Sequence, residues 1–216
     1  MRIVLLFLFS SCFCFSQENE NGWQKKKHHK GIEVYSRKTA NSNFRELKAV
    51  VTIKTSLNSI VALLYDWDSY PEWVYRCGES KTLRKISATE LIHYQSVVAI
   101  WPAQDRDFVV NIKYSQDEKT KVITMKSSCN SDYTPEIEHY VRIKELKATW
   151  TLIPLKDGTV QLTYQLLVHP GGSVPAWIVN MAAVDGPYET MLNLKEWGMK
   201  EKYQKAKSPL VKELTD

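Results

Sequence analysis

One break near the end of the chain limits its fold more than any other feature. A strand-like run from Val160 to Val168 leads directly into Pro170-Gly171-Gly172, which neither a strand nor a helix interior accepts. Ser173 and Pro175 then supply a helix N-cap and an early helical proline, and a long helical pattern follows. Nearly everything before this segment has the pattern of strands. We therefore predict an α+β fold in which a curved antiparallel sheet wraps around a long C-terminal helix.

This helical pattern continues to about Lys205. Gly186-Pro187 should interrupt or kink it, because proline has no N–H to donate and its ring collides with the preceding turn. Methionines at 181, 191 and 199 suit either an adaptable apolar wall or an ordinary core. Beyond Pro187, one apolar stripe recurs at helical spacing and consists of Tyr188, Met191, Leu192, Leu194, Trp197 and Met199.

The rest of the chain is interpreted as one domain of strands with a short early helix. Ser56 is placed to cap a helix from about Leu57 to Asp66. The basic run from Lys25 to Lys30 is interpreted as a solvated segment before the first strand, since no nucleic-acid-binding motif accompanies it. Strands are predicted at residues 31–38, 46–54, 79–86, 90–100, 106–115, 119–127, 138–154 and 158–168, with a hairpin turn at Lys156-Asp157-Gly158.

The first residues predict export. Arg2 precedes an apolar stretch from Ile3 to Phe9, which is too short to span a membrane, and small residues occupy the positions that a signal peptidase reads. We expect cleavage between Ser16 and Gln17. The alternative is cleavage before Cys12 with a lipid attached there, which the apolar neighbours of that cysteine disfavour.

Cleavage after residue 16 leaves two cysteines, Cys77 and Cys129. An exported protein can form a disulfide, worth about 4 kcal/mol for so long a loop, but two free thiols are slightly favoured. The 5 histidines show no metal-ligand spacing, and the sequence has neither a nucleophile elbow nor a phosphate-binding glycine loop. We expect no catalytic residues, no metal and no cofactor.

Period-two geometry places one arginine on an apolar strand face. In the run from Arg106 to Tyr114, Phe108, Val110 and Ile112 point the same way, and Arg106 shares their face. An unpaired buried charge is costly, so this arginine needs a partner. Either it lies at the rim of the sheet with its head in water, or it pairs inside with a carboxylate or a ligand.

Four motifs resemble one protein family. The runs Trp101–Val109 (WPAQDRDFV) and Pro170–Ala183 (PGGSVPAWIVNMAA) resemble signatures of START domains, the lipid-transfer domains related to the steroidogenic acute regulatory protein. The second run is close to the phosphatidylcholine-transfer branch. GIEVYSR from Gly31 and KAVVTI from Lys48 match the family's opening strands. The similarity covers roughly residues 23–205 and indicates a bacterial-type member with a signal peptide.

The resemblance implies a helix-grip fold, with an internal apolar tunnel that holds one lipid beneath a C-terminal helix acting as a lid. We divide the chain into a signal peptide (1–16), a short segment (17–22), the lipid-binding domain (23–207) and a C-terminal tail (208–216). The expected partner is a lipid or other hydrophobic molecule, bound by a monomer that contacts membranes transiently and binds no nucleic acid. The wider superfamily includes cyclases and aromatases, so a cyclase- or hydrolase-like enzyme is the alternative, followed by an interaction domain without a ligand.

The ligand class stays open. Pro71 and Val74 stand where the phosphatidylcholine-binding branch has an arginine and an aspartate, and Ile112 stands near the position of the sterol branch's arginine. The aromatic candidates on strand faces could line a tunnel but are more often plain core, and Trp101 suits core packing better than pocket lining. The candidate ligand-binding residues are Trp73, Tyr94, Trp101, Arg106, Phe108, Trp150, Tyr164, Trp177, Ile178 and Met181.

Overall fold

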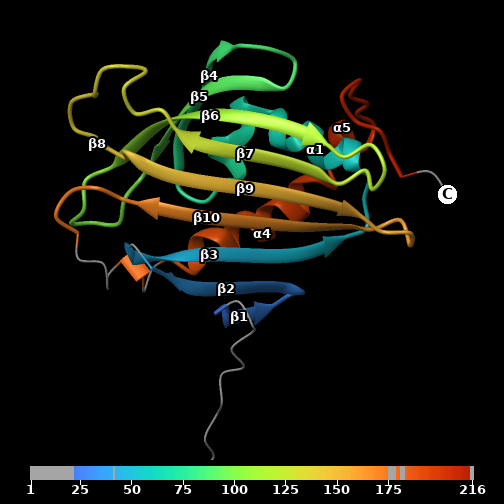
Figure 1. The fold of residues 1–216 in the computed structure, drawn as a ribbon, viewed down its shortest axis with the longest axis horizontal. Helices are drawn as coiled ribbons and strands as arrows, with labels where there is room; N and C mark the ends of the chain where they lie inside the picture. Colours follow the sequence, from blue (N-terminus) through green and yellow to red (C-terminus); the bar gives the residue numbers. More distant parts are fainter. Residues whose placement is uncertain (1–21, 41, 175–178, 181–182, 215–216) are drawn as a thin grey trace, which may run out of the picture.

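A curved antiparallel sheet with helices on one side forms the protein (Figure 1). The computed structural model describes residues 22–40, 42–174, 179–180 and 183–214. The strand order is β1-β2-β3-β10-β9-β7-β6-β5-β4, and β8 pairs in parallel with the start of β6. The strands are β1 (Gln24–His29), β2 (Ile32–Thr39), β3 (Ser42–Ile53), β4 (Cys77–Lys85), β5 (Glu90–Val97), β6 (Arg106–Gln116), β7 (Ile123–Cys129), β8 (Val141–Arg142), β9 (Glu145–Pro154) and β10 (Val160–His169).

The helices cover one face of the sheet, here called the inner face. Side chains from β3, β6, β9 and β10 meet the helices there in one continuous core, and the opposite surface is the outer face. None of the described helices is long and apolar enough to cross a bilayer. The described helical segments are α1 (Leu57–Tyr65), the 3₁₀ turn η1 (Trp67–Ser69), α2 (Tyr70–Trp73), α4 (Asp185–Trp197) and α5 (Glu201–Gln204).

Local signals placed the early helix and most strands correctly. The Ser56 hydroxyl accepts a hydrogen bond from the Ser59 backbone N–H at 3.1 Å, as expected of an N-cap. Gly158 has φ +75°, the left-handed conformation that a tight turn between β9 and β10 requires. Cys77 and Cys129 are free thiols, which confirms the favoured alternative.

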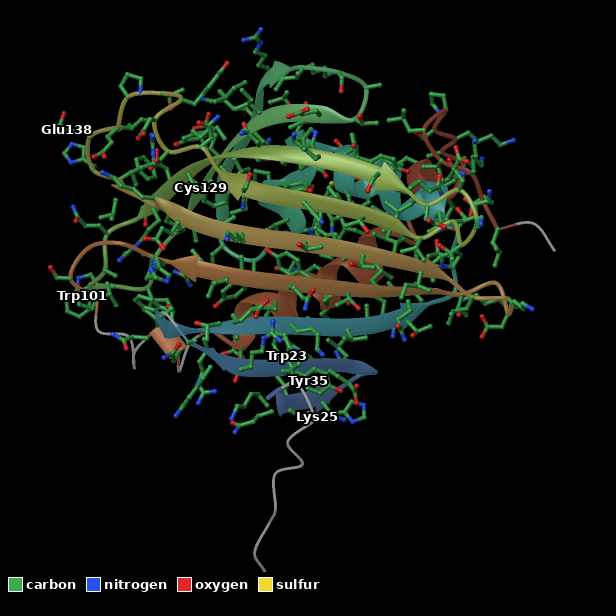
Figure 2. All side chains as sticks on the ribbon, in the orientation of Figure 1. Trp23, Lys25, Tyr35, Trp101, Cys129 and Glu138 are labelled. Atoms are coloured by element: carbon green, nitrogen blue, oxygen red, sulfur yellow. The ribbon has the colours of Figure 1, made fainter. Side chains whose placement is uncertain are left out.

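The basic run near the start forms the edge strand β1 and does not precede the first strand, so that placement is wrong, although most of its side chains are exposed as a solvated segment requires. Side-chain contacts rather than an apolar pattern hold it. Lys25 pairs with Glu33 of β2, Lys27 pairs with Asp185 of α4 at 3.1 Å, and His29 contacts the Tyr188 hydroxyl at 2.7 Å. Trp23, Lys25 and Tyr35 lie together at this edge of the sheet (Figure 2). The contacts to Asp185 and Tyr188 also fix the start of α4 against the sheet.

The predicted interruption of the C-terminal helical pattern is present, two residues before the predicted dipeptide. Residues 183–184 form a turn between the helical residues 179–180 and α4. Gly186-Pro187 stands in the first turn of α4, where a missing proline N–H leaves no hydrogen bond unmade. Tyr188, Met191 and Leu194 are buried as predicted, whereas Met199 is 54% exposed because the helix ends at Trp197. The predicted start of the helix, residues 175–178, lies outside the described residues.

Residues 208–214 pack against the domain. The Tyr114 hydroxyl of β6 donates to the Leu210 carbonyl oxygen at 3.0 Å. The Glu213 carboxylate accepts the backbone N–H groups of Leu57 at 3.1 Å and Asn58 at 2.9 Å. These are the first N–H groups of α1, which have no partner within the helix. Residues 208–214 thus supply the hydrogen-bond acceptors that the first turn of α1 lacks.

Candidate functional site

Half of the inner face is packed solid, and the other half is not. On the central strand β10, Val160 is 2% exposed and Leu162 is 0% exposed. Further along the same inward row, Tyr164, Leu166 and Val168 are only half-buried, although β3 and β9 flank the first two and β9 pairs with Val168. Phe108 of β6 is half-buried on the same face. We call Phe108, Tyr164, Leu166 and Val168 the inner apolar strip.

Two predicted aromatic residues meet within this region. Trp150 of β9 and Tyr164 of β10 are directly paired across the strands, and their rings stack with centroids 4.3 Å apart at an interplanar angle of 17°. Burial raises the pKa of the Tyr164 phenol to about 12. Among the described residues, none forms a hydrogen bond with its hydroxyl group. This hydroxyl is therefore a polar group in apolar surroundings, free to accept or donate to a ligand.

Arg106 lies at the rim of the inner face and is 8% exposed. Its guanidinium donates to the carbonyl oxygens of Gln104 and, from Nε at 3.4 Å, of Pro170. Burial lowers the pKa of this guanidinium, and the nearby charge of Asp105 acts in the opposite direction. The prediction left open a solvated rim or an internal partner, either a carboxylate or a ligand. Among the described residues the partners are backbone carbonyls from two loops and no carboxylate, and the ligand alternative stays a prediction. Arg106 ties the break after β10 to the start of β6.

Two predicted ligand residues lie away from the inner apolar strip. Trp73, at the end of α2, is 1% exposed, and its Nε1–H donates to the Ser69 hydroxyl at 3.2 Å. Tyr94 is buried in a small separate cluster with Ile92 and Val109. Its placement with the pocket-lining aromatics is wrong, because Tyr94 pairs across the strands with Val109, which points to the outer face.

Trp101 is exposed, which corrects both interpretations offered for it. It is 89% exposed in the loop between β5 and β6, so it neither packs in the core nor lines an interior (Figure 2). The loop is fixed by Arg76, which donates to the carbonyl oxygens of Val98 and Ala99, at 2.6 Å each. The remaining candidates, Trp177, Ile178 and Met181, lie outside the described residues.

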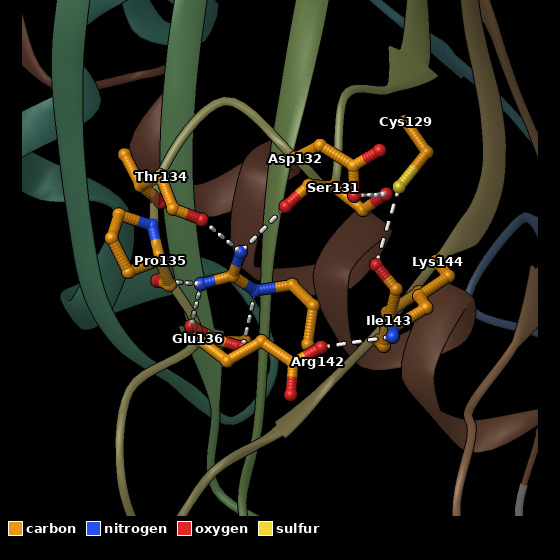
Figure 3. Close-up of polar contacts among 10 residues, drawn as sticks. Cys129, Ser131, Asp132, Thr134, Pro135, Glu136, Arg142, Ile143 and Lys144 are labelled. Carbon is orange, nitrogen blue, oxygen red and sulfur yellow. Dashed lines mark hydrogen bonds and ion pairs between the residues drawn. The ribbon is translucent and has the colours of Figure 1, made fainter.

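A buried ion pair beside this end of the sheet was missed by sequence reasoning. Arg142 and Asp107 have side chains that are 1% and 0% exposed, joined by two hydrogen bonds of 2.9 Å. The same guanidinium donates to the carbonyl oxygens of Ser131, Thr134 and Pro135 at 2.7–3.0 Å (Figure 3). Alternation along β6 indicates that Asp107 points away from Phe108, but it cannot identify Arg142 as the partner, because Arg142 lies 35 residues later in the sequence. This pair shapes the loop between β7 and β8.

An open cleft of about 540 Å³ lies just outside the same end of the sheet. Its walls carry charges of both signs, from Glu136, Lys144 and Glu145, beside Gly171 and Gly172. None of the four residues of the inner apolar strip lines it. Such a mixed, open surface suits an approach to the interior better than the burial of an apolar molecule.

The described residues offer little for catalysis or metal binding. They contain no group of three or more histidine, cysteine or acidic side chains that could hold a metal ion. Ser80 Oγ and His93 Nε2 are 3.2 Å apart, but both residues are buried, and His93 Nδ1 has no partner among the described residues. Burial lowers the pKa of His93 to about 4, and its ring packs on Trp67 with centroids 4.6 Å apart. This pair lacks the acid that would orient and stabilise a catalytic imidazolium.

Comparisons with known proteins agree with this architecture. The START domain model matches residues 16–191. An uncharacterized protein of Pseudomonas aeruginosa is 31% identical over 175 residues, which cover 80% of this chain and 85% of that protein. The phosphatidylcholine transfer protein of Mus musculus is 23% identical over 175 residues, 76% of this chain and 78% of its own. The crystal structure of a STAR-related lipid transfer protein from Xanthomonas axonopodis superposes with a TM-score of 0.77 at 33% identity, covering 83% of this chain and 99% of that one.

Proposed function

This chain belongs to the START domain family, and on that premise we propose that it binds one lipid, or a hydrophobic molecule of similar size, against the inner face of its sheet. The inner apolar strip carries the proposal. Phe108, Tyr164, Leu166 and Val168 are half-buried where a fully packed core would bury them completely. Covering such a surface with an acyl chain gains about 25 cal/mol per Å² of apolar area, before the cost of association.

Native mass spectrometry of the purified protein, followed by lipid extraction, tests this function. We expect a mass increment of lipid size under gentle conditions and a higher melting temperature with added lipid. Leu166→Trp, which fills the inner apolar strip, should abolish both effects. Gln165→Trp introduces the same side chain on the outer face of the same strand and should leave both intact. The proposal would be contradicted if native mass spectrometry showed only the mass of the protein without ligand and no added lipid changed the melting temperature.

We also propose that the segment after β10 is a lid that admits the ligand. Pro170 to Gly172 supplies the joint, and Gly171 and Gly172 have φ of +67° and +66°, a backbone conformation that glycine adopts without strain. Opening would present apolar side chains to a membrane surface, from which a monomer could take up its ligand. The alternative is an ordinary docked helix. Hydrogen exchange tests the lid. The backbone amides of residues 173–185 should exchange with solvent rapidly without ligand and slowly with it, while those of Val160–Val168 stay protected in both states.

Export is a further part of the proposed function. The supporting observation is the sequence itself, with Arg2, the apolar stretch from Ile3 to Phe9 and the small residues before Gln17. Cleavage should leave Gln17 as the first residue, which N-terminal sequencing of the protein from its native host would establish. A lipidated Cys12 would instead support the anchored alternative, and an intact Met1 would contradict export.

We favour binding over the cyclase- or hydrolase-like alternative. The Ser80–His93 pair is sealed in the core, and a neutral imidazole without an acidic partner is a weak base for activating serine. If Ser80 were catalytic, the Ser80→Ala variant should still bind lipid but should no longer turn over an ester or polyketide analogue. We expect ligand binding and no turnover that depends on Ser80.

A further inference from the structure

Three polar side chains meet at the rim of the outer face, outside the inner apolar strip. Ser42 begins β3, His169 ends β10 and Glu145 begins β9, and these three strands are neighbours in the sheet. Ser42 Oγ lies 2.7 Å from His169 Nε2, and Glu145 Oε2 lies 3.3 Å from His169 Nδ1. A hydroxyl, an imidazole and a carboxylate thus follow one another in the order of a hydrolytic triad.

The sheet holds the imidazole from two sides. His169 and Glu145 are directly paired across β10 and β9, and alternation along β10 places His169 on the outer face, opposite to Val168. The ring of Phe44, on β3, packs against the imidazole with centroids 5.0 Å apart and an interplanar angle of 52°. The His169 side chain is 30% exposed, so it is oriented by its neighbours and still reachable from solvent.

The Ser42 hydroxyl is oriented for transfer of its proton. Its oxygen accepts the backbone N–H of Phe44 at 3.0 Å, and its O–H is free to donate to His169 Nε2 at 2.7 Å. The Glu145 carboxylate beside Nδ1 favours a proton on that nitrogen, which leaves Nε2 of the neutral imidazole as the acceptor. In this arrangement the imidazole can take the proton of the serine.

This cluster has two features that the Ser80–His93 pair lacks. Glu145 supplies the acidic partner, whereas His93 Nδ1 has no partner among the described residues. His169 is accessible, whereas His93 is 1% exposed. The Glu145 side chain is 72% exposed, so water screens its charge and the activation of serine is modest. Modest activation suits esters, whose alkoxide leaves more easily than an amine.

The open cleft of about 540 Å³ gives a substrate access to the imidazole. His169 lines it, and Phe44 and Tyr140 add apolar surface. Gly171-Gly172 lines it directly after His169, and neither N–H of this dipeptide has a hydrogen-bond partner among the described residues. Free backbone N–H groups of this kind can bind the oxyanion that forms during acyl transfer. The volume and the mixed walls fit a small, water-soluble molecule.

We propose that Ser42 and His169, with Glu145 as a positioning residue, form a second site that hydrolyses small carboxylic esters in this cleft, independently of lipid binding at the inner face. Ser42 Oγ attacks the ester carbonyl carbon, and its proton passes to His169 Nε2. The C–O bond to the alcohol then breaks, and the imidazolium returns the proton to the leaving oxygen. Water attacks the acyl-serine by the same route, which releases the carboxylic acid and restores Ser42.

Hydrolysis of p-nitrophenyl acetate and butyrate by the full chain tests the activity, and a fluorophosphonate probe tests the nucleophile. The probe loses fluoride when its phosphorus bonds to a serine oxygen, and peptide mass spectrometry locates the added mass. The wild type should turn over both esters and carry the probe on Ser42. Ser42→Ala should lose the label and lower the rate by about 100-fold or more. Ser128→Ala removes an exposed serine of β7 and should change neither.

Controls separate the triad from simple imidazole catalysis, because any exposed histidine cleaves activated esters slowly. His169→Gln should lower the rate by about 100-fold, and His139→Gln, at a position 86% exposed outside the cleft, should leave it unchanged. Glu145→Gln should lower kcat by about 10-fold at constant KM, since the carboxylate orients the imidazole without touching the ester. Glu136→Gln makes the same charge change in the same cleft and should alter neither constant.

The results that would overturn the second site are specific. They are an unchanged rate in Ser42→Ala, a label on a residue other than Ser42, or equal losses in His169→Gln and His139→Gln. Melting temperatures show which variants fold, and if Ser42→Ala does not, the labelled residue in the wild type decides the question. Each of these outcomes leaves lipid binding at the inner face standing, because the two sites lie on opposite faces of the sheet.

Discussion

Replacing Arg142 with methionine should destabilise the protein by about 3–5 kcal/mol, because it leaves the carboxylate of Asp107 buried without its partner. The two side chains are 1% and 0% exposed, so water cannot replace the guanidinium without opening the loop between β7 and β8. The substitution also removes the donor to three carbonyl oxygens, those of Ser131, Thr134 and Pro135. In a domain of this size, such a loss lowers the melting temperature by roughly 6–20 °C.

Urea unfolding followed by tryptophan fluorescence measures this change. Lys144→Met is the matched control, because Lys144 pairs with Glu136 at 2.9 Å from the same loop but its side chain is 65% exposed. Exposed pairs contribute about 0–1 kcal/mol, so the control should stay within about 1 kcal/mol of the wild type. The double variant Asp107→Asn/Arg142→Met should be less destabilised than the sum of the two single variants, by about 2 kcal/mol, since the buried charge is gone.

Two results would refute this reasoning. One is a loss for Arg142→Met no larger than that for Lys144→Met, which would mean that the loop hydrates freely around Asp107. The other is simple additivity of the Asp107 and Arg142 substitutions, which would mean that the two groups do not interact despite two hydrogen bonds of 2.9 Å.

Four other predictions concern single side chains. The pKa of His93 is about 4 in the folded protein and near 6.5 in the unfolded chain, so between these pH values only the unfolded state binds a proton. The free energy of unfolding should therefore fall by about 3 kcal/mol more for the wild type than for His93→Gln between pH 7 and pH 4, as measured by urea unfolding. Burial raises the pKa of Cys77 to about 12, so a disulfide reagent at pH 8 should modify Cys77 only when urea unfolds the protein. Arg106→Ala should destabilise the protein by a few kcal/mol against under about 1 for Lys113→Ala, which is 67% exposed, and equal melting temperatures would place Arg106 in solvent. Glu213→Ala should cost about 1 kcal/mol in urea unfolding by removing the cap on α1, and an unchanged midpoint would show that the end of the chain does not hold the helix.

Sequence patterns predicted the strands that have one apolar face and failed on the strand that has none. The inward row of β10 alternates cleanly, and its register with β3 and β9 follows that alternation. Strand β1 carries lysines and histidines on both faces, so no pattern marks it. Its pairing depends on Glu33, Asp185 and Tyr188, and the last two lie on a helix about 160 residues later, which local sequence does not reveal.

The candidate site was predictable in type and only partly in position. Alternation placed Arg106 correctly on the inner face at the rim, because the side chains of β6 alternate regularly from Arg106 into the core. It did not identify the Pro170 carbonyl as a partner, since that contact spans 64 residues. The assignment of Tyr94 failed because β5 is buried on both faces, with Leu91, Ile92, His93 and Tyr94 all below 7% exposed. A strand covered on both sides gives no signal for which face is inward.

The difference between the two ends of the inner face explains how one sheet can be both stable and open. At one end α1 and residues 208–214 pack beside β6, where the rings of Tyr65 and Tyr114 lie 6.0 Å apart, and Leu162 of β10 is completely buried. Tyr114 donates to the Leu210 carbonyl and Glu213 caps α1, so that end is closed by contacts from far along the sequence. At the other end the same inward row continues with Val168 half-buried and charged side chains at the rim. Because both ends have the same alternating pattern, periodicity alone cannot separate a packed core from a binding surface. The packed end is distinguished by the contacts of α1 and residues 208–214, which the alternation along the strands does not encode.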